Sequence, residues 1–410
     1  IHDPFDEKAA RFESSDPLLN QIAALCRHTL HAASYCGVSV DGERERTPYE
    51  ADAYIAQLGH QYSDTNAPLY RYTLEFLLEF PTWPTEWALH LPLMAEADYE
   101  ATGDIGFTMR LWDKLVPKIL RNRARPDGLL EAGAIVDWPP AERDGFGSGS
   151  IATDNRQMAG PMVNVVANAF ALRSLAAMER LAQAGGKSAE AATFRRDRER
   201  AYKAFLAEFL DEKQGIFTDG PRGGHAALHA NLFPLAFGLV PEAHKKTVVA
   251  FIKSRGMACS VYAAHYLLDG LLAAGETDYV LSLMTAPGDR SWRHMIETGA
   301  GMTWEAWDAK YKPNLTWNHA WGAAPANLLP RYVLGVRPLE PGFAKILIAP
   351  QPGKLRSLKG QVPTYRGPVT VAWERGTITV DVPGNTTAQI VVPGSTTTHE
   401  VGPGRHTFRS

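Results

Sequence analysis

DPLLNQIAALCRHTLHAAS, residues 16–34, is the stretch from which the fold can first be predicted. Its apolar residues recur at three- and four-residue spacing, which predicts an amphipathic helix with one buried face. Asp16 and Pro17 suit the N-cap and the first helical position, where a carboxylate accepts free N–H groups and proline loses no hydrogen bond.

The same spacing recurs along most of the chain, and the connections are loops rich in Gly, Pro, Asp and Trp. About a dozen helices are expected in this region, which makes roughly six helical hairpins. Six hairpins that close into a ring form an (α/α)6 toroid, and this mainly α architecture is the fold we expect. An open helical solenoid is the alternative, but it usually shows a sequence repeat, and we find none. The further helical segments are 49–62, 69–80, 105–123, 164–185, 196–212, 244–255, 260–275, 277–286 and 321–335.

The pattern changes at GVRPLEPGFAKILIAP, residues 335–350. Short segments of alternating β-branched residues follow, separated by Gly and Pro, which predicts a small antiparallel β-sandwich. We therefore expect a catalytic barrel at 16–335 and a β-sandwich at 336–410 that serves for packing. Residues 1–15 form a lead-in that could be the remnant of a β domain.

Composition excludes several classes of protein. The chain has 410 residues and a net charge of −3, which gives no electrostatic argument for binding nucleic acid or an anionic membrane. No apolar run reaches the ~18 residues of a membrane-spanning helix. Cys26, Cys36 and Cys259 form neither a disulfide framework nor a zinc motif, so the cysteines predict no metal site.

The chain begins at Ile1 rather than Met, so we expect that an upstream segment has been removed or is not included in this sequence. No charged-then-apolar leader is visible at the start. The compartment stays open, although a periplasmic or secreted location is preferred to a cytoplasmic one. The oligomeric state is also open.

A run of charged residues, DGERERTPYEAD at 41–52, lies between two apolar segments. Thr47, Pro48 and Glu50 fit a capping box at the start of a helix, which would explain Glu50. Local structure leaves Asp41, Glu45 and Asp52 unexplained. They are either a surface ion-pair network with the neighbouring arginines or part of a functional site.

A second cluster lies in TGAGMTWEAWDAKYKPNLTWNHAWG, residues 298–322. Glu305 is flanked by Trp304 and Trp307, and His319 follows. An ordinary buried acid paired with a base, and a core histidine whose hydrogen bonds are satisfied, are the structural alternatives. The tryptophans of the chain, Trp87 and Trp138 included, fit platforms for a flat, partly apolar ligand such as a sugar ring.

Two carboxylates that are distant in sequence and framed by aromatic residues suit glycoside hydrolysis. One protonates the departing glycosidic oxygen, and the other activates water or attacks the sugar carbon. Asp41 and Asp52 would raise the pKa of Glu45 by like charge, whereas the adjacent arginines act in the opposite direction.

Several motifs resemble glycoside hydrolase family 78, the bacterial α-L-rhamnosidases. They are Asp-Gly-x-Arg-Glu-Arg…Tyr…Asp at 41–52, GMTWEAWD at 301–308, WNHAWGA at 317–323, WALHLPLMAEADYEATGD at 87–104, VDWP at 136–139 and the RYVLGVRPLEPGF passage at 331–343. Their order along nearly the whole chain is that of the family. The chain departs from the family motif in three places. The spacer between Asp41 and Glu45 is shorter than usual, Tyr49 replaces a tryptophan, and Ala51 replaces a glycine.

The resemblance implies an (α/α)6 barrel followed by a β-sandwich and an inverting hydrolysis of α-L-rhamnosides without a cofactor. It implies that Glu45 is the general acid and that Glu305 is the general base. Sugar contacts are implied for a larger set, in which Arg46 orients a carboxylate and Trp304 and Trp307 frame the base. That set is Asp41, Arg46, Asp52, Trp87, Trp138, Trp304, Trp307 and His319.

Three other functions stay open at this point. A non-catalytic sugar-binding protein could use the same scaffold. A polysaccharide lyase would use Tyr49, His90 or His319 as its base, and a glycoside phosphorylase would need a phosphate pocket in place of Glu305. Fold alone does not decide between them.

Overall fold

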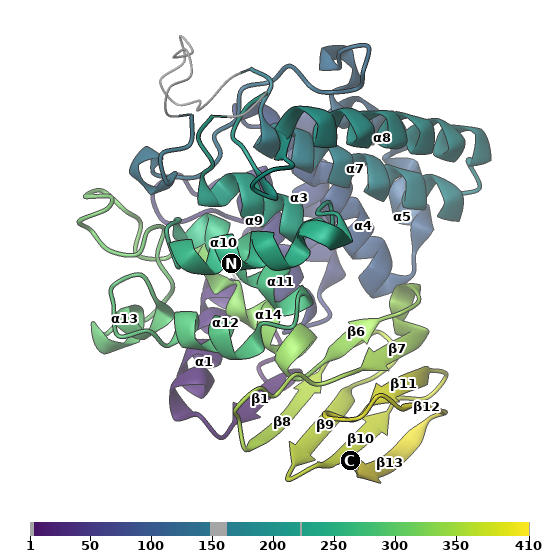
Figure 1. Cartoon of the computed structure of the whole chain (residues 1–410). Coiled ribbons are helices and arrows are strands. Elements are labelled where there is room, and N and C mark those ends of the chain that lie inside the picture. Colours follow the sequence, from purple (N-terminus) through teal and green to yellow (C-terminus); the bar gives the residue numbers. More distant parts are fainter. Residues whose placement is uncertain (1–3, 148–161, 222–223, 410) are drawn as a thin grey trace.

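The computed structural model describes residues 4–147, 162–221 and 224–409. Most of the described chain is a helical body with the C-terminal strands packed against one end of it (Figure 1). Fourteen α-helices occur in the described residues, and consecutive helices such as α7 and α8 lie side by side (Figure 1). They are α1 (Pro17–Ala32), α2 (Glu50–Gln61), α3 (Ala67–Glu79), α4 (His90–Thr102), α5 (Ile105–Arg110), α6 (Trp112–Leu115), α7 (Val165–Ala184), α8 (Ser188–Phe209), α9 (Leu228–Ala236), α10 (Lys245–Arg255), α11 (Val261–Ala273), α12 (Thr277–Met284), α13 (Trp292–Glu297) and α14 (Pro325–Leu328).

Helix α1 confirms the prediction made from residues 16–34. Asp16 is its N-cap, and the carboxylate accepts a hydrogen bond from the Leu18 N–H at 2.9 Å; Pro17 occupies the first turn. Leu19, Ile22, Cys26 and the rest of the apolar stripe are buried. None of the helices in the described ranges is long and apolar enough to span a membrane.

The capping box expected at residues 47–50 is wrong. Helix α2 begins at Glu50, and its N-cap, Tyr49, has extended backbone and makes no side-chain capping bond. The Thr47 carbonyl oxygen instead accepts a hydrogen bond from the Asp41 N–H at 3.1 Å, which closes the preceding turn, so the helix starts later than the motif suggested. The Glu50 carboxylate instead accepts hydrogen bonds from Thr82, at 2.9 Å from its N–H and also from its hydroxyl.

The C-terminal strands form two sheets with orders β1-β8-β9-β10-β13 and β12-β11-β7-β6. All pairs in them are antiparallel, as predicted, except β7 with β11, which is parallel. Strand β1 lies in the lead-in, so residues 11–14 contribute an edge strand to the C-terminal sheet. We retain 16–335 and 336–410 as proposed domain limits. The strands are β1 (Arg11–Ser14), β6 (Val336–Pro338), β7 (Lys345–Ile348), β8 (Ser357–Val362), β9 (Val369–Glu374), β10 (Thr377–Val382), β11 (Thr387–Val391), β12 (Thr398–Val401) and β13 (Gly404–Arg409).

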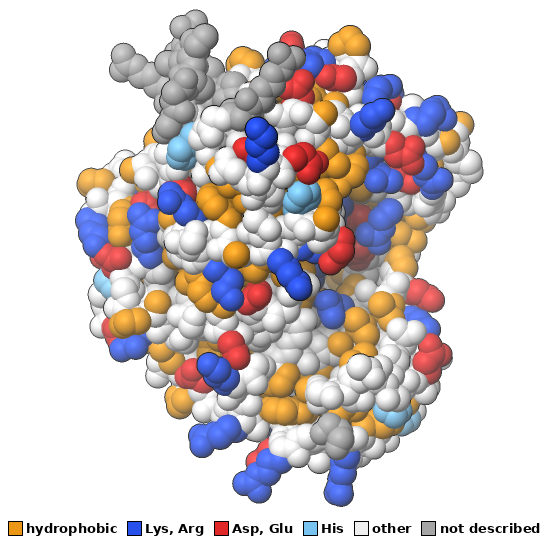
Figure 2. Space-filling view, in the orientation of Figure 1, with side chains coloured by type: hydrophobic (Ala, Val, Ile, Leu, Met, Phe, Trp, Pro, Cys, Tyr) orange, Lys and Arg blue, Asp and Glu red, His pale blue; other side chains and the backbone are white. Residues whose placement is uncertain are grey.

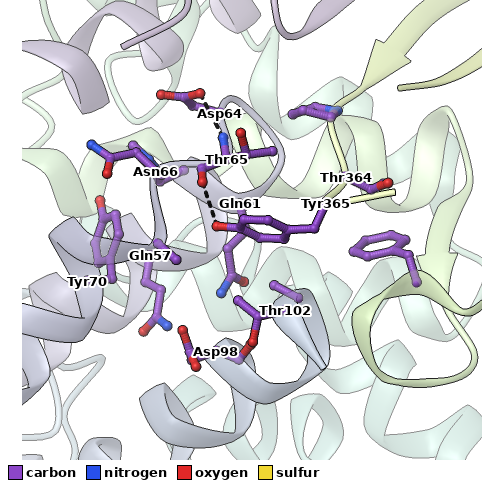
Figure 3. Close-up of a pocket in the computed structure, with 15 residues that line it drawn as sticks. Gln57, Gln61, Asp64, Thr65, Asn66, Tyr70, Asp98, Thr102, Thr364 and Tyr365 are labelled. Carbon is purple, nitrogen blue, oxygen red and sulfur yellow. Dashed lines mark hydrogen bonds between the residues drawn. The ribbon is translucent and has the colours of Figure 1, made fainter. Parts of the chain in front are cut away.

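Tyr365 fastens the strand domain to the helical body (Figure 3). Its hydroxyl donates a hydrogen bond to the Thr65 carbonyl oxygen at 2.5 Å, and its ring lies among Gln57, Gln61 and Thr102. Nearby, the backbones at Gly103 and Gly342 approach so closely that a Cβ on Gly103 would lie 3.3 Å from the Gly342 Cα. On the face shown in Figure 2, acidic and basic side chains are interspersed, in keeping with the small net charge.

Candidate active site

A pocket of about 210 Å³ opens beside the N-terminus of α2. Pockets for drug-sized ligands usually measure about 300–1,000 Å³, so this one suits a single sugar ring. Acidic side chains and aromatic side chains together make up most of its lining. The lining residues are Asp41, Arg44, Glu45, Tyr49, Asp52, Trp83, Trp87, Ile135, Trp138, Glu305, His319 and Trp321.

Two loops that are distant in sequence meet at this pocket. Gly42 forms a β-bridge with His319, and a Cβ on Gly42 would lie only 2.8 Å from the Asn318 carbonyl oxygen. The Glu43 carboxylate accepts hydrogen bonds from the Trp317 N–H at 3.1 Å and the Asn318 N–H at 3.3 Å. The turn that carries Asp41 and Glu45 is therefore held against the loop that carries Glu305 and His319.

Arg44 contacts both of the predicted catalytic carboxylates. Its Nε donates to Glu45 Oε1 at 2.5 Å, and its Nη2 lies 3.4 Å from Glu305 Oε1. Its Nη1 donates to the Asn314 carbonyl oxygen at 2.6 Å. Glu45 and Glu305 consequently face the same cavity, although 260 positions separate them in the sequence.

Glu305 is buried in a set of hydrogen-bond donors and cations. Its Oε2 accepts from the Thr316 N–H at 2.8 Å and from the Thr316 hydroxyl at 3.2 Å. Lys312 Nζ lies 3.2 Å from its Oε1. Burial alone would raise the pKa of Glu305, but the charge of His319, the Thr316 N–H, Lys312 and Arg44 together hold it below the usual value.

His319 links Asp52 to Glu305 through Thr316. Its Nε2 lies 2.6 Å from Asp52 Oδ1, and its Nδ1 lies 2.8 Å from the Thr316 hydroxyl. Burial lowers the pKa of His319, but the bond to Asp52 and the charges of Asp52 and Glu305 outweigh burial, so the pKa is raised. A protonated His319 would donate to Asp52 and to the Thr316 hydroxyl, which would then donate to Glu305.

Asp41 is buried beside the same cluster. Its Oδ1 has no hydrogen-bond partner among the described residues. Burial and the nearby charge of Asp52 raise its pKa to about 7. The interpretation of Asp41 and Asp52 as a surface ion-pair network is therefore wrong, because both side chains are buried.

The aromatic residues divide into two groups. Trp87 and Trp138 line the pocket as predicted, and Trp87 makes an edge contact with Tyr49 at 5.8 Å between ring centroids. Trp304 and Trp307 do not line it. Trp307 is fully buried and donates to the Cys259 carbonyl oxygen at 2.8 Å, so it belongs to the core.

Arg46 also lies outside the pocket. Its guanidinium donates to the Glu43 carbonyl oxygen at 2.8 Å, and the side chain is exposed. His90, a base considered for the lyase alternative, is buried away from the pocket and bonds to the Tyr266 hydroxyl at 3.0 Å.

The site residues that the sequence analysis did not predict include Arg44, Ile135, Lys312 and Thr316. A lysine in DAKYKPN looks like a solvated loop residue, and no local signal marks it as a partner of Glu305. Ile135 precedes the VDWP motif, which was the available hint. In the described ranges, no group of three or more His, Cys, Asp or Glu residues is arranged to hold a metal ion.

Comparison with known proteins gives consistent matches. A family model described as the bacterial alpha-L-rhamnosidase 6 hairpin glycosidase domain matches residues 7–333, and one described as the bacterial alpha-L-rhamnosidase C-terminal domain matches residues 335–407. Alpha-L-rhamnosidases from Alteromonas sp. (strain LOR) and Formosa agariphila are 29% and 27% identical over 62% and 71% of this chain. The chain covers only 28% and 32% of their lengths, about a third.

A solved structure supports the fold. The Streptomyces avermitilis alpha-L-rhamnosidase complexed with L-rhamnose matches with a TM-score of 0.80 at 20% identity, over 98% of this chain and 42% of that one. Together with the family models, this match confirms the predicted six-hairpin toroid with a C-terminal β domain.

Proposed function

Because the chain belongs to the bacterial α-L-rhamnosidases of glycoside hydrolase family 78, we propose that it removes terminal α-L-rhamnose from glycosides with inversion at the anomeric carbon. The observation that carries this proposal is the pair Glu45 and Glu305, which face one sugar-sized cavity from different loops. A carboxylate pair on either side of a glycosidic bond is the minimal apparatus for the reaction.

The two carboxylates have unequal surroundings, which suggests different roles. The Glu305 side chain is 3% exposed and receives donors on both oxygens, whereas the Glu45 side chain is 29% exposed and has one cationic partner, Arg44. A base must be ionised before it can take a proton, and the low pKa of Glu305 fits that role. Glu45, nearer to solvent, fits the acid that protonates the leaving oxygen.

In the proposed reaction, Glu305 takes a proton from water as the water oxygen attacks the anomeric carbon. Glu45 gives its proton to the glycosidic oxygen as that bond breaks, and the products are β-L-rhamnose and the free alcohol. Asp41, Asp52 and His319 bind hydroxyl groups of the sugar, and Trp87 and Trp138 contact its apolar faces.

The stereochemical course is the test of this proposal. We expect the protein to hydrolyse an aryl α-L-rhamnoside, and proton NMR of the first minutes should show the β anomer of rhamnose before mutarotation. The α anomer as first product would indicate a retaining mechanism. Binding of L-rhamnose without any hydrolysis would favour the non-catalytic sugar-binding alternative.

Asp41→Asn should change stability in a pH-dependent way. The Asp41 pKa is about 7 in the folded protein and about 4 in the unfolded chain, so the unfolded state releases this proton first. Asp41 therefore lowers the free energy of unfolding progressively from pH ~4 to ~7 and by a constant amount above that. We therefore expect the difference in Tm, Asp41→Asn minus wild type, to be larger at pH 8 than at pH 4, and calorimetry at the two pH values would measure it.

Asp52→Asn is the matched control for this stability prediction. It removes a carboxylate that is bonded to His319, so it should leave a buried imidazolium without its partner and lower the Tm. If the Tm of Asp41→Asn differs from that of wild type by the same amount at pH 4 and at pH 8, the prediction is contradicted.

A further inference from the structure

One wall of the pocket, Ile135 and Trp138, flanks a strained turn. The Asp137 N–H donates to the Ile135 carbonyl oxygen at 2.7 Å, and the residue between them, Val136, has φ +65°. This is a γ-turn with positive φ, which is rare, and a β-branched residue seldom adopts it. Such strain persists only where the surrounding structure determines it, and it concentrates at functional sites.

Glu86 holds one side of this turn. It lies in the short helix Thr85–Leu89 and is buried. Its Oε1 accepts hydrogen bonds from the Ile135 N–H and, at 3.2 Å, from the Val136 N–H. Its Oε2 has no partner among the described residues, and burial raises the pKa of this carboxyl group to about 7.

Asp137 holds the other side. Its two oxygens accept from the Trp138 N–H at 2.8 Å, His229 Nε2 at 2.7 Å, the Ser260 N–H at 2.8 Å and the Ser260 hydroxyl. Ser260 is the N-cap of α11, and His229 lies on α9, so the turn is tied to two helices of the body. The Arg143 guanidinium donates to the Asp137 carbonyl oxygen at 3.0 Å, and its positive charge acts on both acids.

We propose that Glu86 and Asp137 are positioning residues, which hold the turn and thereby the wall formed by Ile135 and Trp138. Ile135 in turn makes the pocket select a 6-deoxy sugar over its 6-hydroxy counterpart. Neither acid lines the pocket, so each acts through the turn. Ile135 is the one aliphatic side chain among the described lining residues. A hydroxyl group buried against it would lose its hydrogen bonds to water without replacement, whereas a methyl group would gain contact. The inference rests on the proposed function for the identity of the sugar.

Calorimetric binding of L-rhamnose and L-mannose tests this sugar preference without catalytic turnover. Wild type should bind L-rhamnose at least about tenfold more tightly. Glu86→Gln keeps an acceptor oxygen for the two N–H groups and should keep this preference. Glu86→Ala removes the acceptor, so its affinities for L-rhamnose and L-mannose should lie within about threefold of each other. Its KM for an aryl α-L-rhamnoside should rise by a larger factor than its kcat falls.

Glu142→Gln is the matched control. Glu142 is also a buried acid, but it pairs with Arg290 at 3.0 Å instead of contacting the turn, so its loss should lower the Tm and leave the sugar preference intact. If Glu86→Ala does not fold, Ile135→Ser tests the wall directly, because its hydroxyl should remove the preference for L-rhamnose.

Two results would overturn the inference: a wild type that binds both sugars equally, or a folded Glu86→Ala that keeps the wild-type preference and loses only stability. If the wild type prefers L-rhamnose to L-mannose but hydrolyses no rhamnoside, the proposed function is overturned, whereas the role of Ile135 and its turn in sugar selection is still supported.

Discussion

Glu305→Gln should lower kcat on α-L-rhamnosides by roughly a factor of 1,000, which is within the range for loss of a general base. The glutamine amide has nearly the size of the carboxylate, but it cannot take a proton from water. The loss should be similar for substrates with good and poor leaving groups, because activation of water is needed for both. Steady-state kinetics on an alkyl and a dinitrophenyl α-L-rhamnoside would measure it.

The surroundings of Glu305 add a structural cost to this variant. If the amide oxygen stays on Thr316, the NH₂ group faces Lys312 and Arg44. If the amide is reversed, its NH₂ group meets the Thr316 N–H. Either orientation loses a favourable contact, so a moderate fall in Tm is expected beside the loss of activity.

Added azide distinguishes the loss of a general base from structural damage to the pocket. Azide is a nucleophile that needs no deprotonation, so it should restore turnover of Glu305→Gln and give β-L-rhamnosyl azide. A variant that retains kcat within tenfold of wild type would show that Glu305 is not the base. A variant that is inactive, folded and not rescued by azide would point to a binding role for Glu305.

The sequence predicts those features that depend on local pattern. The N-terminus of α1 follows from Asp16 and Pro17, and the buried stripe follows from helical spacing. The strands of the C-terminal domain follow from alternation, as in β10, where Ile378 and Val380 are buried and their neighbours are not. The start of α2 is different, because it depends on a turn closed by a bond from the Asp41 N–H to the Thr47 carbonyl oxygen at 3.1 Å. The local motif does not show this bond, so it does not show that Tyr49, and not Thr47, precedes the helix.

The same distinction explains which site residues the sequence could predict. Arg44 and Arg46 are two positions apart in one charged run, and the positive φ of Arg46, 54°, belongs to a turn that leaves Arg44 on the pocket side. Trp307 is close to Glu305 in sequence, yet its ring contacts Trp292 at 5.0 Å in the core. Which side chains of an irregular loop point toward a pocket depends on contacts with distant segments, and one sequence does not contain that information.

Glu45→Gln should lower kcat on an alkyl α-L-rhamnoside by roughly a factor of 1,000, but on a dinitrophenyl α-L-rhamnoside by less than about tenfold. An alkoxide leaves only when it is protonated, whereas dinitrophenolate is a stable anion that needs no acid. This dependence on the leaving group is the signature of a general acid, and Glu305→Gln should lack it. The variant should fold normally, because Glu45 is partly exposed and its amide can still accept from Arg44 Nε.

The pH profile adds a second, independent requirement. In wild type, the alkaline limb of kcat/KM reports the deprotonation of the acid, so that limb should disappear for dinitrophenyl α-L-rhamnoside with Glu45→Gln. Asp41 is the competing donor, because it is buried in the same pocket with a pKa of about 7. If Glu45→Gln keeps the alkaline limb and Asp41→Asn shows the leaving-group dependence, the proton comes from Asp41, and Glu45 serves only to hold Arg44 in place.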